Sequence, residues 1–384
     1  MSARPRIDSF DLLRGLVMVV MALDHTRDYL AAGGMDPRDL SQPAMFLTRW
    51  ITHYCAPVFV FLAGVSAFLY GSRGKTLPQV SRFLWTRGLW LIVLELTVVR
   101  IGWTFGLAPE FIPAQVIWAI GCSMVALSGL VFLPRSVIAA VGLVMIFGHN
   151  LLDGIRAEDF ESGGWIWMIL HQPGPLHPFE GVMFYVAYPL VPWIGVIAAG
   201  YALGPVATLE AQERRRWLLR IGLGACAGFV LLRGLDGYGN PAPWSAEGGV
   251  MTSVLSFINC EKYPPSLLFL LMTLGPSIAL LSPLESARGW LARTLITIGR
   301  VPLFYYVLHI PLIHLVAVGV AIATGFDTAW LFGGFPIFAK PEGYGVGLLG
   351  VYVIWFAVVV ALIPLCRWFS GVKQRRDDWW LSYL

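Results

Sequence analysis

Residues 12–25, LLRGLVMVVMALDH, place Arg14 and His25 in a stretch that is otherwise almost wholly apolar and, with its flanks, long enough to cross a bilayer. An ionisable side chain in hydrocarbon costs at least a few kcal/mol unless it faces protein or water, so its presence is a functional hypothesis. The eleven-residue separation is close to three helical turns, which places both side chains on one helix face about 16 Å apart. Asp24 and Asp28 flank the histidine. The stretch predicts a reaction path through a membrane.

The composition fits a membrane setting. The chain has 384 residues, of which 57% are hydrophobic and 13% charged, whereas a soluble domain carries about 25% charged residues. Apolar runs recur along the whole length, so we expect one transmembrane domain over residues 1–384 and no separate soluble domain. The N-terminus lacks a small-residue cleavage site after a short apolar core, and no removable signal peptide is predicted.

Hydropathy predicts an all-α, polytopic integral membrane protein with about ten spanning helices. Most Lys and Arg residues fall in one set of alternating connections, so the positive-inside rule places both termini in the cytoplasm. An even number of spans agrees with that placement. The predicted spans lie near residues 9–31, 46–71, 81–105, 113–133, 136–153, 182–204, 217–235, 264–283, 299–323 and 344–367.

The outer face would then carry three long connections, near 154–181, 236–263 and 324–343, all rich in Gly, Pro and aromatic residues. Loops of this length are usually functional or disordered, and so many tryptophans argue against disorder. Aromatic rings suit the faces of sugars. Interfacial anchoring by Trp and Tyr is the alternative explanation.

The standard motifs of soluble enzymes are missing from the sequence. The five cysteines are isolated, and no CxxC or Cys/His spacing indicates zinc, so no metal is expected. There is no phosphate-binding loop, no G-x-S-x-G elbow and no dinucleotide fingerprint in a strand–helix context. No nucleic-acid partner is expected either.

Further polar residues lie within or at the ends of the predicted spans, most of them in the outer half. Together they predict a polar cavity that opens outward, with Arg14 nearer the cytoplasmic mouth. Each also has a structural explanation: a histidine can simply bond a neighbouring helix, and Glu95 can pair with Arg100. The candidates for acceptor binding are His53, Glu95, Arg100, Lys262, Tyr263 and His309.

The first predicted span carries Arg14 and His25 with ten residues between them. This spacing is similar to the signature of the transmembrane acyltransferase superfamily, which includes acyltransferase family 3. The fuller pattern RIDSFDLLRGLVMVVMALDHTRDY (6–29), followed by THYCAPVFVFLAGVSAFLYG (52–71), resembles the heparan-α-glucosaminide N-acetyltransferase-like branch. Later segments, including GRVPLFYYVLHIPLIH (299–314), resemble bacterial members of that branch. The resemblance extends over nearly the whole chain.

The resemblance implies transfer of an acyl group, with acetyl expected, from cytoplasmic acyl-CoA to a carbohydrate or glycolipid at the outer face. His25 would be the catalytic base or acyl relay, and Arg14 would help hold the CoA. The lysosomal enzymes of the branch carry Asn where His25 stands and a catalytic His in the following loop, whereas this chain has no His between Thr26 and Thr52. That departure favours a hydroxyl over an amine acceptor. A bacterial inner (plasma) membrane location is expected.

Acyl-transfer chemistry needs an activated nucleophile and a stabilised oxyanion. A neutral imidazole at His25 can accept the acceptor's proton, or can itself carry the acyl group. Asp28, one turn away, is the expected orienting acid, with Asp24 as the other candidate.

Arg82 and Arg87 could assist Arg14 at the CoA phosphates. A proton-coupled transporter or flippase of a sugar-containing substrate is the alternative function. The oligomeric state is not predicted.

Overall fold

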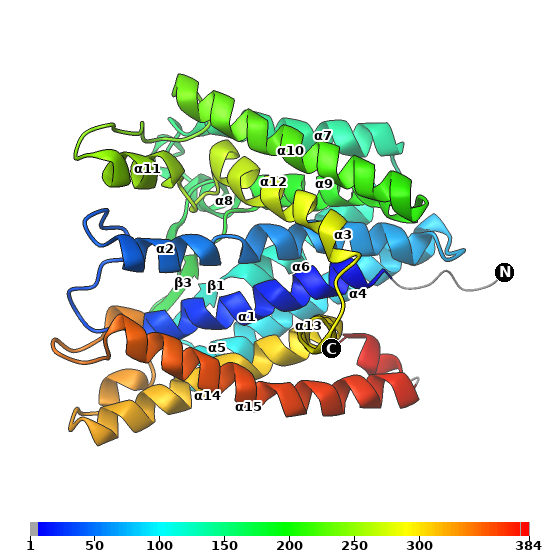
Figure 1. Ribbon diagram of the computed structural model, residues 1–384. Helices are drawn as coiled ribbons and strands as arrows, with labels where there is room; N and C mark the ends of the chain where they lie inside the picture. Colours follow the sequence, from blue (N-terminus) through cyan, green and yellow to red (C-terminus); the bar gives the residue numbers. More distant parts are fainter. Residues whose placement is uncertain (1–6, 377, 384) are drawn as a thin grey trace.

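The computed structural model describes residues 7–376 and 378–383 and shows a bundle of long helices (Figure 1). About 70% of the chain is helix and 5% is strand. The helices are α1 (Asp8–Leu30), α2 (Pro43–Thr52), α3 (Cys55–Gly71), α4 (Leu77–Leu94), α5 (Arg100–Thr104), α6 (Val116–Leu130), α7 (Arg135–Gly148), α8 (Gly164–Leu170), α9 (Leu190–Leu203), α10 (Ala211–Leu235), α11 (Val250–Ile258), α12 (Leu267–Leu284), α13 (Trp290–Arg300), α14 (Pro302–Ala323) and α15 (Leu348–Arg375). The short turns are the π-helical η1 (Glu95–Val99) and the 3₁₀ turns η2 (His149–Leu152), η3 (Ala157–Asp159), η4 (Gly204–Thr208), η5 (Ala329–Leu331), η6 (Pro336–Phe338) and η7 (Trp379–Tyr383).

Helix α1 runs through the middle of the bundle. It packs against α2, α3, α12, α13, α14 and α15 (Figure 1). Most of its side chains are therefore buried, including the charged residues Asp11 and Arg27. Because neighbouring helices enclose them, the buried polar groups of α1 face protein, which is the setting in which membrane proteins tolerate them.

Within the described residues, seven helical segments are long and apolar enough to cross a membrane. The other three predicted spans coincide with α1, with α4 and α5, and with the shorter α6. The count of ten spans and the cytoplasmic placement of both termini therefore stay predictions. The start of α1 and the end of α15 lie at one end of the bundle (Figure 1), as an even number of crossings requires. The seven segments are Pro43–Gly71, Arg135–Leu152, Leu190–Thr208, Ala211–Leu235, Leu267–Leu284, Pro302–Ala323 and Leu348–Arg375.

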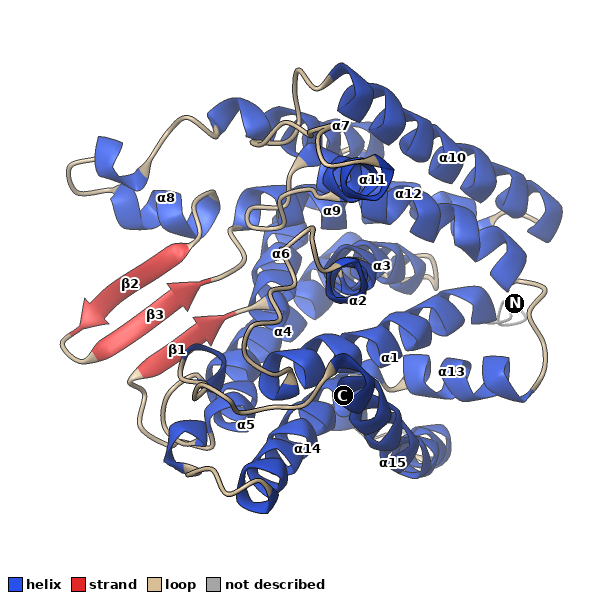
Figure 2. Ribbon diagram, turned by 60° about the vertical axis from the view of Figure 1, so that its left-hand side comes forward, coloured by secondary structure: helices blue, strands red, loops and turns tan. Residues whose placement is uncertain are grey.

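A three-stranded sheet at the other end of the bundle corrects the all-α expectation (Figure 2). Its strands are β1 (Phe111–Ala114), β2 (Gly174–Phe179) and β3 (Val182–Val186). The order is β1-β3-β2, with β3 parallel to β1 and antiparallel to β2. The hydropathy pattern missed β3 because its apolar residues run on into those of α9, so the predicted span 182–204 starts eight residues too early. The sheet gives ordered structure to a predicted outer connection.

Close helix crossings in the bundle depend on glycine. A methyl group added to Gly299 of α13 would overlap the carbonyl oxygen of Asp11 in α1, and one added to Gly15 would overlap that of Leu295. Between α4 and α6, Gly88 and Gly121 approach each other's backbone in the same way. Small residues at such crossings let helix backbones pack closely, as is typical of membrane bundles.

Candidate active site

A small cavity lies beside the His25 imidazole, toward the C-terminal end of α1. Its volume is about 30 Å³, room for about two ordered waters by the usual requirement of about 10–15 Å³ each. It lies where five separate parts of the chain meet. The lining residues are Met21, Asp24, His25, Thr52, Cys55, Ala56, Phe59, Gln115, Val116, Tyr188 and Lys262.

The His25 side chain is buried and its ring packs among aromatic groups. The edge of the Trp103 indole lies against it, with ring centroids 4.7 Å apart, and the His309 ring lies at 5.1 Å. Among the residues that the structure describes, neither ring nitrogen of His25 has a hydrogen-bond partner. Buried polar atoms are normally paired, so an unpaired imidazole beside a cavity is a place where a ligand's donor or acceptor can bind.

Asp24 is the centre of a buried ionic network at this cavity. Its Oδ1 lies 2.6 Å from Nη2 of Arg27, and the Thr52 hydroxyl donates to it at 2.7 Å. The Lys262 ammonium lies 3.8 Å from its Oδ2. Asp28, the expected orienting acid, instead pairs with Arg27 at 2.7 Å, and neither carboxylate makes a hydrogen bond to His25. Asp24 lines the cavity beside the imidazole, whereas Asp28 does not.

Lys262 reaches the cavity from the segment before α12. Burial lowers the pKa of its ammonium, but Tyr263 and the Asp24 carboxylate outweigh that effect, so the net pKa lies above the usual lysine value. The ammonium also lies 5.1 Å from the centroid of the Tyr263 ring. Tyr263 in turn packs edge-on against Tyr188 of the cavity wall, at 5.3 Å. A fixed positive charge therefore stands at the cavity, close to His25.

Behind His25 lies a second group of buried polar residues. The Nε2 atom of His309 has no hydrogen-bond partner within the described part of the chain, and its Nδ1 lies 2.7 Å from the Tyr306 carbonyl oxygen. Glu95 is fully buried in the π-helical turn η1, and its carboxylate is close enough to the Tyr306 hydroxyl to interact with it electrostatically. Arg100 does not pair with Glu95, because its guanidinium donates to the carbonyls of residues 107 and 108 at 3.0 and 2.7 Å. Isolated π-helical turns are frequent at functional sites.

His53 caps α2 and lies outside this cavity. It is buried, its ring packs on Phe269 with centroids 5.2 Å apart, and neither ring nitrogen is hydrogen-bonded. It shares the electrostatic field of Asp24 and Lys262 without lining the cavity beside His25. His53 is thus a neighbour of the candidate active site rather than a part of its wall.

Arg14 lies toward the other end of α1 and does not line the cavity. Its guanidinium donates to Asp11 at 2.9 Å, to the Gly299 carbonyl at 3.3 Å and to the Ser66 hydroxyl at 3.2 Å. Arg87 of α4 is within electrostatic reach of Arg14, whereas Arg82 is exposed. Arg14 and His25 thus lie toward opposite ends of α1, and buried apolar side chains of α1 lie between them.

Several residues of the candidate active site were not singled out from the sequence. Thr52, Gln115 and Tyr188 line the cavity, Trp103 contacts His25, and Arg27 pairs with Asp24. Gln115 carried a usable signal, because it is the lone uncharged amide in the apolar run FIPAQVIW. The others look like ordinary helix-end or aromatic residues until tertiary contacts bring them to His25.

The sequence profile described as heparan-alpha-glucosaminide N-acetyltransferase, catalytic, matches residues 6–231. No curated protein matches the chain. The matched range contains Asp24, His25 and Glu95 and ends before Lys262 and His309. These two residues lie outside the matched range in sequence, but Lys262 is near Asp24 and His309 packs against His25.

Proposed function

The chain belongs to the heparan-α-glucosaminide N-acetyltransferase family, and from that premise we propose that it is a membrane-embedded transferase moving an acetyl group from acetyl-CoA to a carbohydrate or glycolipid. The donor would enter from the cytoplasm and the acceptor from the outer face. The site contacts support treating residues 1–384 as one transmembrane acyltransferase domain, because Lys262 and His309 lie beyond the matched range yet adjoin Asp24 and His25. A bacterial plasma membrane is the proposed location.

One observation carries the proposal: a buried imidazole with both nitrogens unpaired lies beside a cavity that also holds a carboxylate and an ammonium. A neutral His25 can take the proton of an acceptor hydroxyl or amine as that group attacks the thioester carbonyl carbon. Asp24 then stabilises the imidazolium that forms. The same proton can return to the CoA thiolate as the carbon–sulfur bond breaks.

Charge also develops on the thioester oxygen during attack. The Lys262 ammonium, held by Asp24 and above its usual pKa, supplies positive charge at the cavity. Fixed donors aimed at a developing oxyanion are commonly the largest single contribution to acyl-transfer catalysis. In this proposal Lys262 stabilises the oxyanion while His309 and Tyr263 help to hold the acceptor.

The CoA would bind at the opposite end of α1. Arg14 and Arg87 bring two guanidinium groups near each other there, and their charge suits the CoA phosphates. Along α1, the rise from Arg14 to His25 is about 16 Å, so the donor's arm would have to extend inward along the helix. The cavity beside His25 holds only about 30 Å³, so lining side chains such as Met21 and Phe59 would have to move on binding; flexible methionine suits that role.

Labelled acetyl-CoA tests the proposal with purified wild-type protein in detergent, where no transmembrane gradient exists. We expect label to move from acetyl-CoA to glucosamine or to N-acetylglucosamine. Labelling of N-acetylglucosamine requires a hydroxyl acceptor, and labelling of glucosamine alone indicates its amine. A protein that leaves acetyl-CoA intact with both sugars, yet moves a sugar across vesicles under a proton gradient, would be the alternative transporter and would contradict the proposal.

A further inference from the structure

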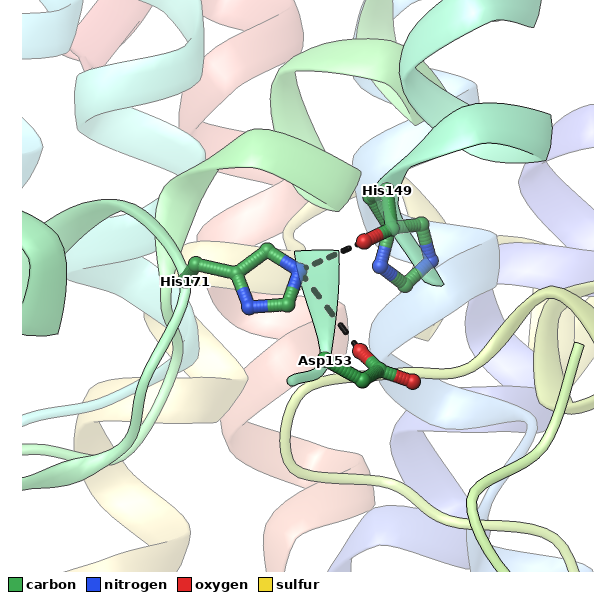
Figure 3. Close-up of side chains that lie close together, drawn as sticks. All are labelled: His149, Asp153 and His171. Atoms are coloured by element: carbon green, nitrogen blue, oxygen red, sulfur yellow. Dashed lines mark hydrogen bonds and ion pairs between the residues drawn. The ribbon is translucent and has the colours of Figure 1, made fainter. Parts of the chain in front are cut away.

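A second group of ligating side chains lies away from the candidate active site, where α7 ends and α8 returns to it. His149 and Asp153 stand at the start and the end of η2, and His171 caps α8 (Figure 3). One potential ligand atom from each of the three residues lies within 4.8 Å of the others. Two imidazoles and one carboxylate thus converge on a single point.

The burial and bonding of these side chains are unusual for residues with only a structural role. His149 and His171 are 2% and 3% exposed. The His149 ring faces the backbone at Pro265, but neither ring nitrogen completes a hydrogen bond to any residue described in the structure. Buried ring nitrogens normally have partners, so the two nitrogens of His149 point to a missing ligand.

Surrounding groups hold the other two ligands in orientation. Asn150 donates from Nδ2 to Asp153 Oδ2 at 2.9 Å, which leaves Oδ1 turned toward His171, 3.7 Å from its Nε2 (Figure 3). The Trp167 indole stacks on the His171 ring with centroids 5.1 Å apart. Support of this kind from neighbouring residues is typical of metal ligands.

We propose that His149, Asp153 and His171 bind one Zn²⁺ ion. Two histidines and a carboxylate are a zinc ligand set, with metal–ligand distances near 2.0–2.2 Å. Tetrahedral binding at those distances puts ligand atoms about 3.3 Å apart, so the His171–Asp153 pair needs only a small side-chain rotation. His171 Nε2 would exchange its 2.8 Å hydrogen bond to the His149 carbonyl for the metal. A water molecule completes the fourth position.

The ion would act as a clamp rather than as part of the transfer chemistry. It would tie α8 and the connection after η2 to the end of α7. Asn150 extends the clamp, because its Oδ1 accepts a hydrogen bond from the Leu267 backbone at the start of α12, 2.8 Å away. The segment just before α12 carries Lys262 into the candidate active site. The zinc proposal stands independently of the acetyl-transfer proposal, since its ligands contact neither His25 nor Asp24.

The test uses the full chain, purified without a polyhistidine tag, stripped with a chelator and then given ZnCl₂. We expect one zinc per chain by elemental analysis and a higher Tm with zinc than without it. Co²⁺ in place of Zn²⁺ should give visible absorption bands. His149→Gln and His171→Gln should lose the ion and the Tm shift, whereas His177→Gln, an exposed histidine of β2, should keep both.

Should the histidine variants fail to fold, Asn150→Ala keeps all three ligands and should weaken zinc binding about tenfold or more. Unchanged zinc affinity in that variant contradicts the proposed orientation of Asp153. Less than a tenth of an equivalent of zinc on the wild type, iron in place of zinc at these residues, or equal zinc loss in His177→Gln would overturn the proposal.

Discussion

Replacing Asp24 by asparagine removes one negative charge from the candidate active site with almost no change in shape. Asp24 lies 2.6 Å from an Arg27 nitrogen and 3.8 Å from the Lys262 ammonium. At an effective dielectric constant near 20, the closer contact alone represents about 6 kcal/mol of gross attraction. Arg27 keeps its second partner, Asp28, but Lys262 is left without a neighbouring carboxylate at this cavity.

The net effect is smaller than the gross attraction, because charges taken out of water lose solvation. Breaking a buried ion pair by removing one partner costs about 3–5 kcal/mol. The side chains of Asp24 and Arg27 are 14% and 8% exposed, so solvent screens them little. We expect Asp24→Asn to lower the free energy of unfolding by about 3 kcal/mol.

Asp36→Asn is the matched control. Asp36 faces Arg38 at 3.7 Å, but the two side chains are 54% and 77% exposed, and exposed pairs contribute about 0–1 kcal/mol. Denaturant titration in detergent, followed by tryptophan fluorescence, measures both variants. Adding Lys262→Met to Asp24→Asn should recover part of the loss, because no uncompensated ammonium then remains. Equal destabilisation by Asp24→Asn and Asp36→Asn would refute the buried network.

Two further predictions concern the bundle and its loops. Gly299→Ala should lower Tm, because the added methyl group overlaps the Asp11 carbonyl and separates α13 from α1. Gly319 has open space around it, so Gly319→Ala should leave Tm unchanged or raise it. Similar melting curves for the two variants would contradict the close crossing. Arg233→Ala should expose the 236–259 connection to limited proteolysis, because the buried Arg233 guanidinium donates to four backbone carbonyls of that connection. Arg220→Ala, a change of an exposed arginine, should not. Protection of Arg233→Ala equal to that of wild type would show that the arginine does not order the connection.

The helices of this fold could be predicted far better than its small sheet. A run of apolar residues identifies a spanning helix directly, and each of the ten predicted spans contains helix. The strands are only four to six residues long and lie among prolines, glycines and aromatic residues in connections. The pairing of β1 with β3 joins segments about 70 residues apart, and no local pattern encodes that pairing.

Within the candidate active site, the sequence singles out Asp24, His25 and Lys262 but not Arg27 and Thr52, which also bond Asp24. His25 stood out because an ionisable group in an apolar run is costly. Helical spacing predicts Asp28 as the acid beside His25, whereas Asp24 is the one that lines the cavity, where Lys262 and Thr52 reach it from distant parts of the chain. Spacing along one helix predicts the direction in which each side chain points. The groups that each side chain pairs with depend on the neighbouring helices.

Initial rates of acetyl transfer by wild type and by His25→Gln decide whether the His25 imidazole is the general base. We expect His25→Gln to lower kcat by about 10²–10⁴-fold, the usual contribution of a positioned general base. His177→Gln, a change of an exposed histidine outside the cavity, should keep the wild-type rate. Wild-type turnover by a folded His25→Gln protein would show that His25 is not the base.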